Sequence, residues 1–500
     1  MQASPGAEAK LVVGRATDAI GLDPARITDL ESAEVCEQIY DHLVRFAPGG
    51  TEIQPALAER WEVSPSGTEW TFHLRRNVRF HDGSPFDADA VAFTFDRQRD
   101  PRNAFHQPDF AYEAMLRSIE RVERIDKYTV KMVIERAYAP FLSNLAMFAT
   151  GIVSPTAVRA WGDQYPFHPV GTGPFKFVEW SRGERITLAA NRDYWDGAPK
   201  VSHLVFMAVR DPRQRLVAIE GGAIDVAERL DPEDIQFVAL HPELRVERIA
   251  GNNVSYLAMN TQHPPFGDLR VRLAVNHAIN KVPILKLVFQ GTALPARGAL
   301  APSVWGHVEL PEVTYDPALA RRLLAEAGYL QGRPLKLYVM SSARSYLPSP
   351  LRVARMIARN LTDVGMRVEI VSNPLEEHLR AVSNGEHDLC LLGWNGDNGD
   401  PDNFLYGLFD SDNAVVGNAR NLAFFRDPQL HGLLRWAQES LDRAQRVIYY
   451  AEAQQIIAAR APWVPLAHAE IIVARRLDVT NLVVEPTAML HFQSVGLERR

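Results

Sequence analysis

Hydrophobic residues along the chain recur at two spacings, one typical of strands and one typical of helices. In the stretch EWTFHL, Trp70, Phe72 and Leu74 alternate with polar residues, which predicts a half-buried strand. Asp87 then stands where a helix N-cap is expected, directly before the run ADAVAFTFDRQ. The sequence therefore predicts a strand followed by a helix in this part of the chain.

A stronger helical pattern begins near residue 351. Apolar residues recur there at intervals of three, one, four and three: Val353, Met356, Ile357, Leu361 and Val364. Gly365 is placed to end this helix. Similar helical segments alternate with strand-like runs from about residue 256 onward, an order that implies crossover connections. We therefore expect an α/β domain with a largely parallel sheet over roughly 259–477.

A Pro/Gly-rich stretch, PFHPVGTGPF at 166–175, interrupts the patterned segments. Such a composition predicts a turn or linker, and a domain boundary fits there. Strand-like runs and a helix from Pro212 to Gly221 follow it.

Composition narrows the class of protein. The 500 residues are 46% hydrophobic and 23% charged, which predicts a folded, soluble protein of two or three domains. The net charge of −7 and the absence of a long Lys/Arg cluster argue against nucleic acid as a partner. No run approaches 18 apolar residues, so we expect no membrane span.

The first residues and the cysteines bear on the compartment. MQASPGAEAK has neither a basic nor an apolar signal region; it would suit a mature terminus whose signal peptide is absent from this chain, and a cytosolic protein can begin in the same way. Cys36 and Cys390 are expected to be buried as small hydrophobic residues, and a disulfide between them stays open. No Cys/His spacing favours a metal site.

The loop GWNGDNGDPDNF at 393–404 carries the candidate chemistry. It follows the strand-like run DLCLL, and ligands of open α/β sheets bind beyond the carboxyl ends of strands. Three other interpretations remain: a solvated turn, a calcium loop, although the EF-hand register is missing, and a glycosidase carboxylate pair. Gly-x-Ser-x-Gly and His-Glu-x-x-His do not occur, and VGTGPF lacks the third glycine of a dinucleotide loop. We therefore expect no catalytic residue, metal or cofactor.

Several longer blocks resemble one known family. ALAERWEVSPSGTEWTFHLRRNVRFHDGSPFDADAVAFTFDR, GTGPFKFVEW, NRDYWDGAPKVSHLVF, AIEGGAIDVA, VRLAVNHAINK and LLAEAGY are similar, in this order, to the peptide and nickel class of extracellular solute-binding proteins of ABC importers. GWNGDNGDPDNF and ARSYLPSP resemble the dipeptide-binding members of that class. The resemblance covers nearly the whole chain.

This resemblance implies a three-domain α/β clamshell that closes on its ligand by hinge bending. The expected domains are a discontinuous first jaw at 10–46, 166–258 and 478–500, an extra domain at 47–165 and a second jaw at 259–477. The family also implies a periplasmic protein, which we expect to be a monomer, that delivers its ligand to a membrane permease.

The resemblance also assigns roles in binding. In dipeptide-binding members an Asp after the strand holds the peptide's ammonium group and an earlier Arg holds its carboxylate, which places these roles on Asp397 and Arg344. One anion and one guanidinium fork suit a ligand whose two charged ends lie roughly 7 Å apart, at about 3.3 to 3.6 Å per residue. The aromatic residues Tyr346 and Trp394 are expected to form walls of the pocket.

Further ligand contacts are expected from the main chain. Gly393, Asn395 and Gly396 would pair with an extended peptide as an added strand does. Thr28, Asp29 and Leu30 match, by position alone, the loop that closes over the ligand from the first jaw.

The chain departs from the family after the DPDNF motif, where relatives often carry a cysteine pair and this chain has none. The range of ligands can therefore differ from that of the relatives, and haem, glutathione and opine-like solutes remain alternative ligands. A hydrolase that uses Asp397, and a receptor or chaperone that signals through a partner, are the alternatives of other classes.

Overall fold

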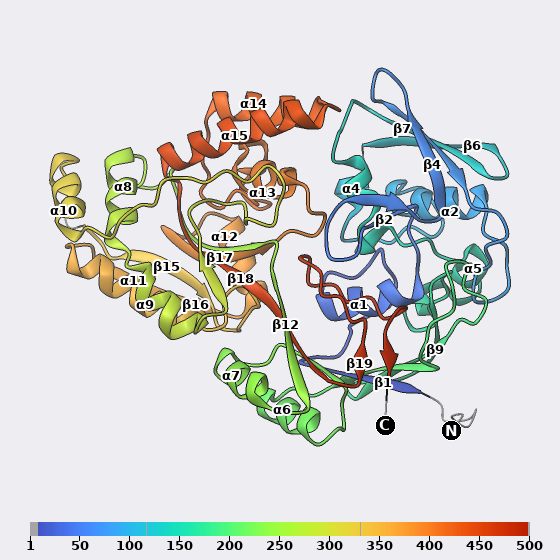
Figure 1. Ribbon diagram of the computed structural model, residues 1–500. Helices are drawn as coiled ribbons and strands as arrows, with labels where there is room; N and C mark the ends of the chain where they lie inside the picture. The colour runs from blue at the N-terminus through green and yellow to red at the C-terminus, as the bar shows by residue number, and fades with distance from the viewer. Residues whose placement is uncertain (1–8, 117, 331, 499–500) are drawn as a thin grey trace. The chain divides into compact units, whose positions relative to one another are not determined.

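The computed structural model describes residues 9–116, 118–330 and 332–498 (Figure 1). These residues form two compact units. The first ends at Arg248 and resumes at Ile472, and the second is Ile249–Ile471. Helices and strands are mixed in both units, so the predicted α/β class is confirmed.

The larger sheet of the first unit is built around β1. Across this sheet the strands are β11 (Val226–Glu228), β1 (Lys10–Arg15), β10 (His203–Ala208), β9 (Arg185–Ala190) and β8 (Phe175–Ser181). β1 runs parallel to β10 and β11, whereas β9 is antiparallel to both of its neighbours, β10 and β8. The unit also contains β2 (Val44–Phe46), β3 (Ile53–Pro55), β19 (Val479–Thr480) and β20 (Gly496–Leu497).

A second sheet of the first unit is antiparallel and has its own hydrophobic core. Its strands, in order, are β4 (Ala58–Val63), β5 (Glu69–Leu74), β7 (Thr129–Ile134) and β6 (Ile119–Asp126). Trp70, Phe72 and Leu74 are all buried on one face of β5, as their alternation predicts. Asp87 caps α2 (Ala88–Arg99) by accepting a hydrogen bond from the Asp89 N–H at 3.1 Å, which confirms the predicted helix start.

The remaining helices of the first unit are mostly short. They are α1 (Leu30–Ile39), α3 (Glu113–Leu116), α4 (Phe141–Leu145), η1 (Phe148–Thr150), α5 (Pro155–Trp161), η2 (Gly162–Phe167), α6 (Pro212–Glu220) and α7 (Pro232–Leu240). The Pro/Gly-rich stretch leads into β8, and a side chain at Gly171 or Gly173 would collide with the backbone of Ile39. These two glycines therefore allow a close approach of two backbone segments.

The sheet of the second unit carries the predicted site. Across it the strands are β16 (Val368–Asn373), β15 (Leu335–Met340), β17 (Leu389–Asn395), β13 (Asn253–Met259) and β18 (Trp463–Arg476), with β14 (Ala293–Pro295) also paired to β18. β15 is parallel to β16 and β17, but β13 is antiparallel to β17 and to β18. The prediction of a largely parallel sheet is therefore wrong for half of it. The helices α11 and α12 connect β15, β16 and β17, which are parallel. β13 follows the chain's first passage between the units, and β18 contains the second.

Helices surround this sheet. They are α8 (Leu269–Ala278), α9 (Lys281–Ile284), the π-helix η3 (Leu285–Phe289), α10 (Pro317–Glu326), α11 (Pro350–Asp363), α12 (Leu375–Ser383), α13 (Pro401–Phe409), η4 (Ser411–Asn413), α14 (Pro428–Glu439) and α15 (Arg443–Arg460). α11 confirms the helix predicted near residue 351, and Gly365 follows it with φ +95°. The strand β12 (Leu244–Ala250) leads from the first unit into the second.

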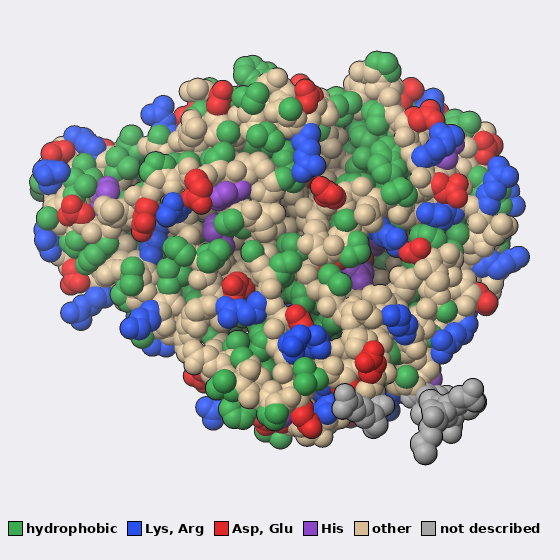
Figure 2. Space-filling model, viewed as in Figure 1, with side chains coloured by type: hydrophobic (Ala, Val, Ile, Leu, Met, Phe, Trp, Pro, Cys, Tyr) green, Lys and Arg blue, Asp and Glu red, His purple; other side chains and the backbone are tan. Residues whose placement is uncertain are grey.

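Cys36 in α1 and Cys390 in β17 are both buried free thiols, as small hydrophobic residues would be. No helix in the described residues is both long and apolar enough to cross a membrane. Figure 2 shows basic and acidic side chains interspersed over the face that it draws.

Candidate ligand-binding site

The two predicted charged anchors follow neighbouring parallel strands. β15 and β17 pair in parallel, with Val339 opposite Leu391. Because parallel strands end at the same edge of a sheet, the segments that follow Met340 and Asn395 leave from one edge. Arg344 and Asp397 lie in these two segments. The fold therefore brings two residues that are 53 positions apart in the sequence to one edge of the second unit.

The Arg344 segment is fixed against β17. Arg344 and Leu347 exchange backbone hydrogen bonds of 3.1 and 2.9 Å and so form a small antiparallel bridge. The Tyr346 ring lies directly on Gly393, where any side chain would collide with its Cδ2 atom. Burial raises the pKa of Tyr346 to about 12. Gly393 thus makes room for the Tyr346 ring, which is buried in the hydrophobic core of the second unit. The predicted role of Tyr346 as a wall of the pocket stays a prediction.

The Arg344 side chain is partly buried and makes no hydrogen bond or ion pair within the described part of the chain. Its charge acts on the neighbouring Tyr346, where it opposes the rise in pKa. The N–H donors of this guanidinium group are therefore all available to a ligand.

The acidic loop contains two aspartates that hold the fold. Asp400 is 2% exposed, accepts a hydrogen bond of 2.6 Å from Arg446 Nη2 and caps α13 through the Asp402 N–H at 3.0 Å. Asp402 is also buried and accepts a hydrogen bond of 3.2 Å from Gln438 Nε2. The interpretation of the run as a solvated turn is therefore wrong for both residues.

Asp397 differs from these two. Its side chain is only partly buried and forms no hydrogen bond or ion pair with any described residue. Burial raises the pKa of Asp397 to about 6, and the positive charge of Arg420 opposes this shift. The carboxylate is consequently mostly ionised at neutral pH and has no hydrogen-bond donor of its own.

The segment between Leu392 and Asp397 is more regular than the sequence indicates. β17 extends to Asn395, so Gly393, Trp394 and Asn395 belong to the strand and not to a loop beyond it. Trp394 is held in place, since its Nε1 donates to Asn403 Oδ1 at 2.7 Å.

The backbone of this segment is only partly available. Gly396 N–H donates to Asn252 O at 2.7 Å, so this group is used within the protein, and the predicted contact of the Gly396 backbone with a peptide stays a prediction. On the β13 side the pairing of β17 continues to Asn395. On the β15 side it stops at Leu391, which leaves that edge of Gly393 and Asn395 as the remaining place for an added strand.

The three residues predicted from the first jaw lie in the first unit, at the start of α1. Thr28 is exposed, and Leu30 is the first residue of the helix. Asp29 is the N-cap and accepts a hydrogen bond of 2.8 Å from Ser32 N–H. Its Oδ2 atom is buried without a hydrogen-bond partner in the described chain, and burial raises the pKa of Asp29. Their role toward a ligand stays a prediction.

Two residues of the second unit were missed by sequence reasoning. Arg420 is exposed, acts electrostatically on Asp397, and its side chain has no hydrogen bond to another described residue. Asn252 is 1% exposed, and neither side-chain polar atom has a partner among the described residues. Nothing in the sequence around Arg420 indicates that it lies close enough to Asp397 to act on it. The pair Gly251-Asn252 directly before a strand is a weak sequence signal of an unusual backbone position.

One group of side chains in the described residues has a spacing that could suit a metal: Asp410, Asp412 and His431. The His431 ring nitrogen Nδ1 lies 3.0 Å from Asp410 Oδ2, and Asp412 Oδ2 accepts from the Tyr406 hydroxyl at 3.0 Å. These bonds account for the cluster without an ion.

Residues 52–415 match the family of bacterial extracellular solute-binding proteins, family 5 Middle. The chain belongs to this family. Like its relatives, this solute-binding protein has the mixed α/β fold of periplasmic binding proteins, which confirms the expected fold class.

Individual relatives resemble this solute-binding protein over most of its length. It is 37% identical to di/tripeptide-binding protein 2 of Pseudomonas aeruginosa, over 96% of this chain and 93% of the relative. It is 33% identical to heme-binding protein A of Haemophilus influenzae, over 96% and 90%. The solved structure of DppA, an ABC transporter-associated periplasmic binding protein from Helicobacter pylori in complex with the peptide STSA, matches with a TM-score of 0.86 and 33% identity over 98% of both chains.

Proposed function

We propose that this protein binds dipeptides and other short peptides by their two charged ends and delivers them to an ABC importer. The observation that carries the proposal is the pair formed by Asp397 and Arg344. One ionised carboxylate and one guanidinium group, both without hydrogen-bonding partners in the described residues, follow adjacent parallel strands. Relatives over nearly the full chain include di/tripeptide-binding proteins, which supports the same ligand class.

In this proposal each end of the peptide meets one charge. Asp397 accepts hydrogen bonds from the α-ammonium group, and Arg344 donates to the α-carboxylate. Tyr346 and Trp394 line the space between the two ends, and the open edge of β17 at Gly393 and Asn395 pairs with the peptide backbone. Such a site reads main-chain groups, so we expect it to accept many side chains.

The rest of the proposal follows the family. Thr28, Asp29 and Leu30 contact the ligand from the first unit, and the protein closes around the ligand by hinge bending between jaws with the boundaries given above. It acts in the periplasm as a monomer, carries no cofactor and catalyses no reaction.

Haem is a second candidate, because a heme-binding relative is 33% identical over 96% of this chain. Haem carries two carboxylates and no ammonium group, so Asp397 would repel it at neutral pH and would have no partner. Arg344 and Arg420 would be the residues to hold the propionates. Glutathione offers an ammonium group and carboxylates and is compatible with Asp397.

Calorimetry with Ala-Ala, Ala-Ala-Ala, glutathione and haem tests the proposal. We expect Ala-Ala or Ala-Ala-Ala to bind at least as tightly as the other two solutes. Tight binding of haem together with no measurable binding of either peptide would contradict the proposal. The same peptides are recovered and analysed after incubation, and catalytic release of alanine would favour a hydrolase instead.

A further inference from the structure

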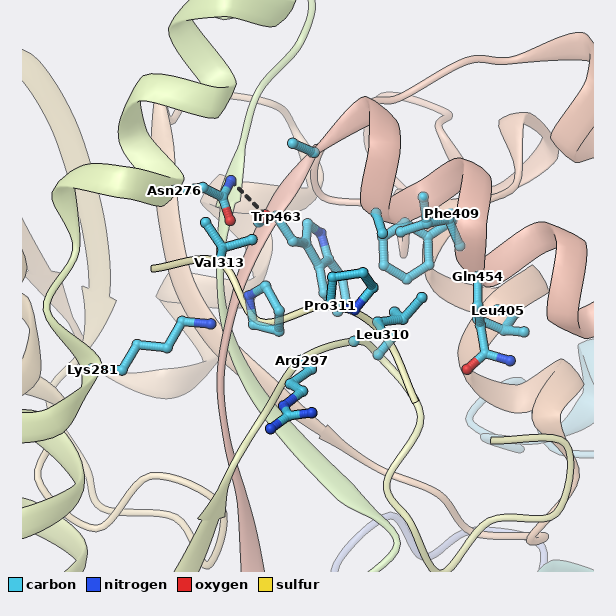
Figure 3. Close-up of a pocket in the computed structure, with 16 residues that line it drawn as sticks. Asn276, Lys281, Arg297, Leu310, Pro311, Val313, Leu405, Phe409, Gln454 and Trp463 are labelled. Carbon is cyan, nitrogen blue, oxygen red and sulfur yellow. Dashed lines mark hydrogen bonds between the residues drawn. The ribbon is translucent and has the colours of Figure 1, made fainter. Parts of the chain in front are cut away.

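The second unit contains a pocket that shares no residue with the predicted peptide site (Figure 3). It lies among α8, α9, α13, α15, the start of β18 and the irregular segment that follows β14. Its empty volume is about 590 Å³, which includes a part open to solvent.

Most of the pocket wall is apolar. The apolar lining residues are Ala299, Leu310, Pro311, Val313, Leu405, Phe409, Ile457, Ala458, Ala461, Trp463 and Pro465. Trp463 is rigidly placed, because its ring stacks on Tyr256 at 3.4 Å between centroids and contacts Phe409 at 4.2 Å. Gly298 allows Leu310 to pack closely against the backbone, since a Cβ atom at this position would lie 2.8 Å from Leu310 Cδ1. The walls thus form a preformed surface for an apolar group.

A single ammonium group faces these walls. Lys281 reaches into the pocket from the start of α9, and Figure 3 shows its Nζ directed toward the middle of the lining residues. Nζ donates one hydrogen bond, to Ala296 O at 3.1 Å, and has no ion-pair partner within 4.0 Å in the described chain. Burial lowers the pKa of Lys281 to about 8, and Glu312 opposes the shift. A charge in such surroundings is stabilised by an anion beside it.

The other polar groups of the wall are largely engaged. Arg297 is paired with Glu309 at 3.0 Å and lies 3.9 Å from Glu312, so its charge is already balanced. Asn276 Nδ2 donates to Trp463 O at 3.0 Å, which leaves its carbonyl oxygen without a hydrogen bond from any described residue. Trp463 Nε1 is buried and also lacks a partner there. Lys281 is therefore the one charged lining residue that has no ion pair within 4.0 Å among the described residues, with Glu312 acting on it only at longer range.

We propose that this pocket is a second binding site, which takes a small apolar monocarboxylate with its carboxylate on Lys281 and its hydrocarbon part against Trp463, Phe409 and Leu310. The proposal rests on the apolar lining, on an ammonium group without an ion pair among the described residues, and on the opening of the pocket to solvent. It is independent of peptide binding, because the two sites have no residue in common.

Octanoate is the probe, and octanamide, which has the same chain and no charge, is the matched control ligand. Calorimetry of the full-length protein is expected to show octanoate binding at least about tenfold more tightly than octanamide, because a charge-assisted hydrogen bond is stronger than a neutral one. Lys281→Met should abolish this preference. Lys286→Met, which removes an exposed lysine of η3 outside the lining, should leave it unchanged.

Ala458→Trp provides a second variant, because Ala458 is an exposed residue of α15 at the pocket and a large side chain there should block entry without disturbing the core. We expect at least a tenfold loss of octanoate affinity. The proposal is overturned if octanoate does not bind, if octanoate and octanamide bind equally, if Lys281→Met and Lys286→Met act alike, or if Ala-Ala displaces octanoate. Failure of Ala-Ala to bind would overturn the proposed function and leave this test intact.

Discussion

Asp397 and Asp400 lie three residues apart in one loop and have opposite surroundings. Asp400 is 2% exposed, paired with Arg446 and joined to the start of α13. Asp397 is partly exposed and has no hydrogen bond or ion pair among the described residues. The Asp400 carboxylate stabilises the fold through its bonds, whereas the Asp397 carboxylate makes no bond that stabilises the fold. A charge that the protein keeps near neutral pH without a partner is a candidate for binding an external charge.

The largest expected effect is on ligand affinity when Asp397 is changed. Asp397→Asn should weaken Ala-Ala binding by roughly a hundredfold to a few thousandfold, because the peptide ammonium group would lose its counter-charge in a desolvated site. Calorimetry measures the affinity. The melting temperature without ligand should stay the same or rise, because no bond within the protein is lost.

Asp402 lies in the same acidic loop as Asp397, but Asp402→Asn is an unsuitable control because Asp402 is buried and bonded to Gln438. Asp363→Asn is better matched, because Asp363 is an exposed residue at the end of α11. It should change the affinity by less than about threefold. Equal losses in Asp397→Asn and Asp363→Asn would mean that the ammonium site is elsewhere.

Asp400→Asn should show the reverse pattern. Breaking a buried ion pair leaves Arg446 uncompensated and costs about 3 to 5 kcal/mol of unfolding free energy. Asn can still cap α13, so the helix start is kept and the loss reports the ion pair. Denaturant unfolding measures the change, and the peptide affinity of the folded protein should fall far less than in Asp397→Asn. A stable Asp400→Asn variant that no longer binds peptide would reverse the two roles.

The affinity for Ala-Ala should depend moderately on pH, and this dependence should identify Asp397 as the titrating acid. With its pKa at about 6, the carboxylate is mostly protonated at about pH 5 and mostly ionised at about pH 7, so Ala-Ala should bind roughly tenfold more weakly at the lower pH. The peptide's own end groups keep their charges over this interval. In Asp397→Asn this dependence should disappear, and its persistence would assign it to another group.

The ionisation of Asp397 should also affect the unfolding free energy, but in the opposite direction to its effect on peptide affinity. The folded protein binds more protons at Asp397 than the unfolded chain between about pH 4 and 6, because the pKa of this group is raised from 3.8 to about 6. The contribution of Asp397 to the unfolding free energy therefore falls as the pH rises through this window. Comparison of the unfolding curves of the parent and Asp397→Asn over this window isolates it, and identical pH slopes would contradict the raised pKa.

The smallest expected effect concerns Arg420. Arg420→Met should weaken Ala-Ala binding by less than about threefold if Arg344 holds the peptide carboxylate, since an exposed charge contributes little. Arg344→Met should weaken it about as strongly as Asp397→Asn does. If the two arginine variants exchange their effects, Arg420 is the carboxylate anchor.

Much of this contrast could be predicted from sequence, but not all. The order of strands and helices predicts that Arg344 and Asp397 lie in segments that follow strands of one sheet, and the family resemblance selects them. The sequence does not predict which aspartates are paired, because Asp400 precedes α13 and its partner Arg446 lies 46 residues further on, in α15. The contact of Tyr346 with Gly393 is hidden for the same reason.

The direction of β13 and β18 was also beyond the sequence pattern. Alternation of apolar residues indicates a strand but not its neighbours or its direction. The length of β17 was underestimated because glycine and asparagine are typical of turns, whereas here pairing with β13 keeps them in the sheet. Local preferences therefore predicted the elements better than the contacts between them.

The most direct test of the central claim is a cycle that combines a protein change with a ligand change. Ala-Ala and N-acetyl-Ala-Ala are titrated against the parent protein and against Asp397→Asn by calorimetry. The parent should prefer the free peptide by at least about a hundredfold, and Asp397→Asn should prefer it by less than about threefold, since both changes remove the same ion pair. If the variant keeps the full preference of the parent, Asp397 does not bind the peptide's ammonium group.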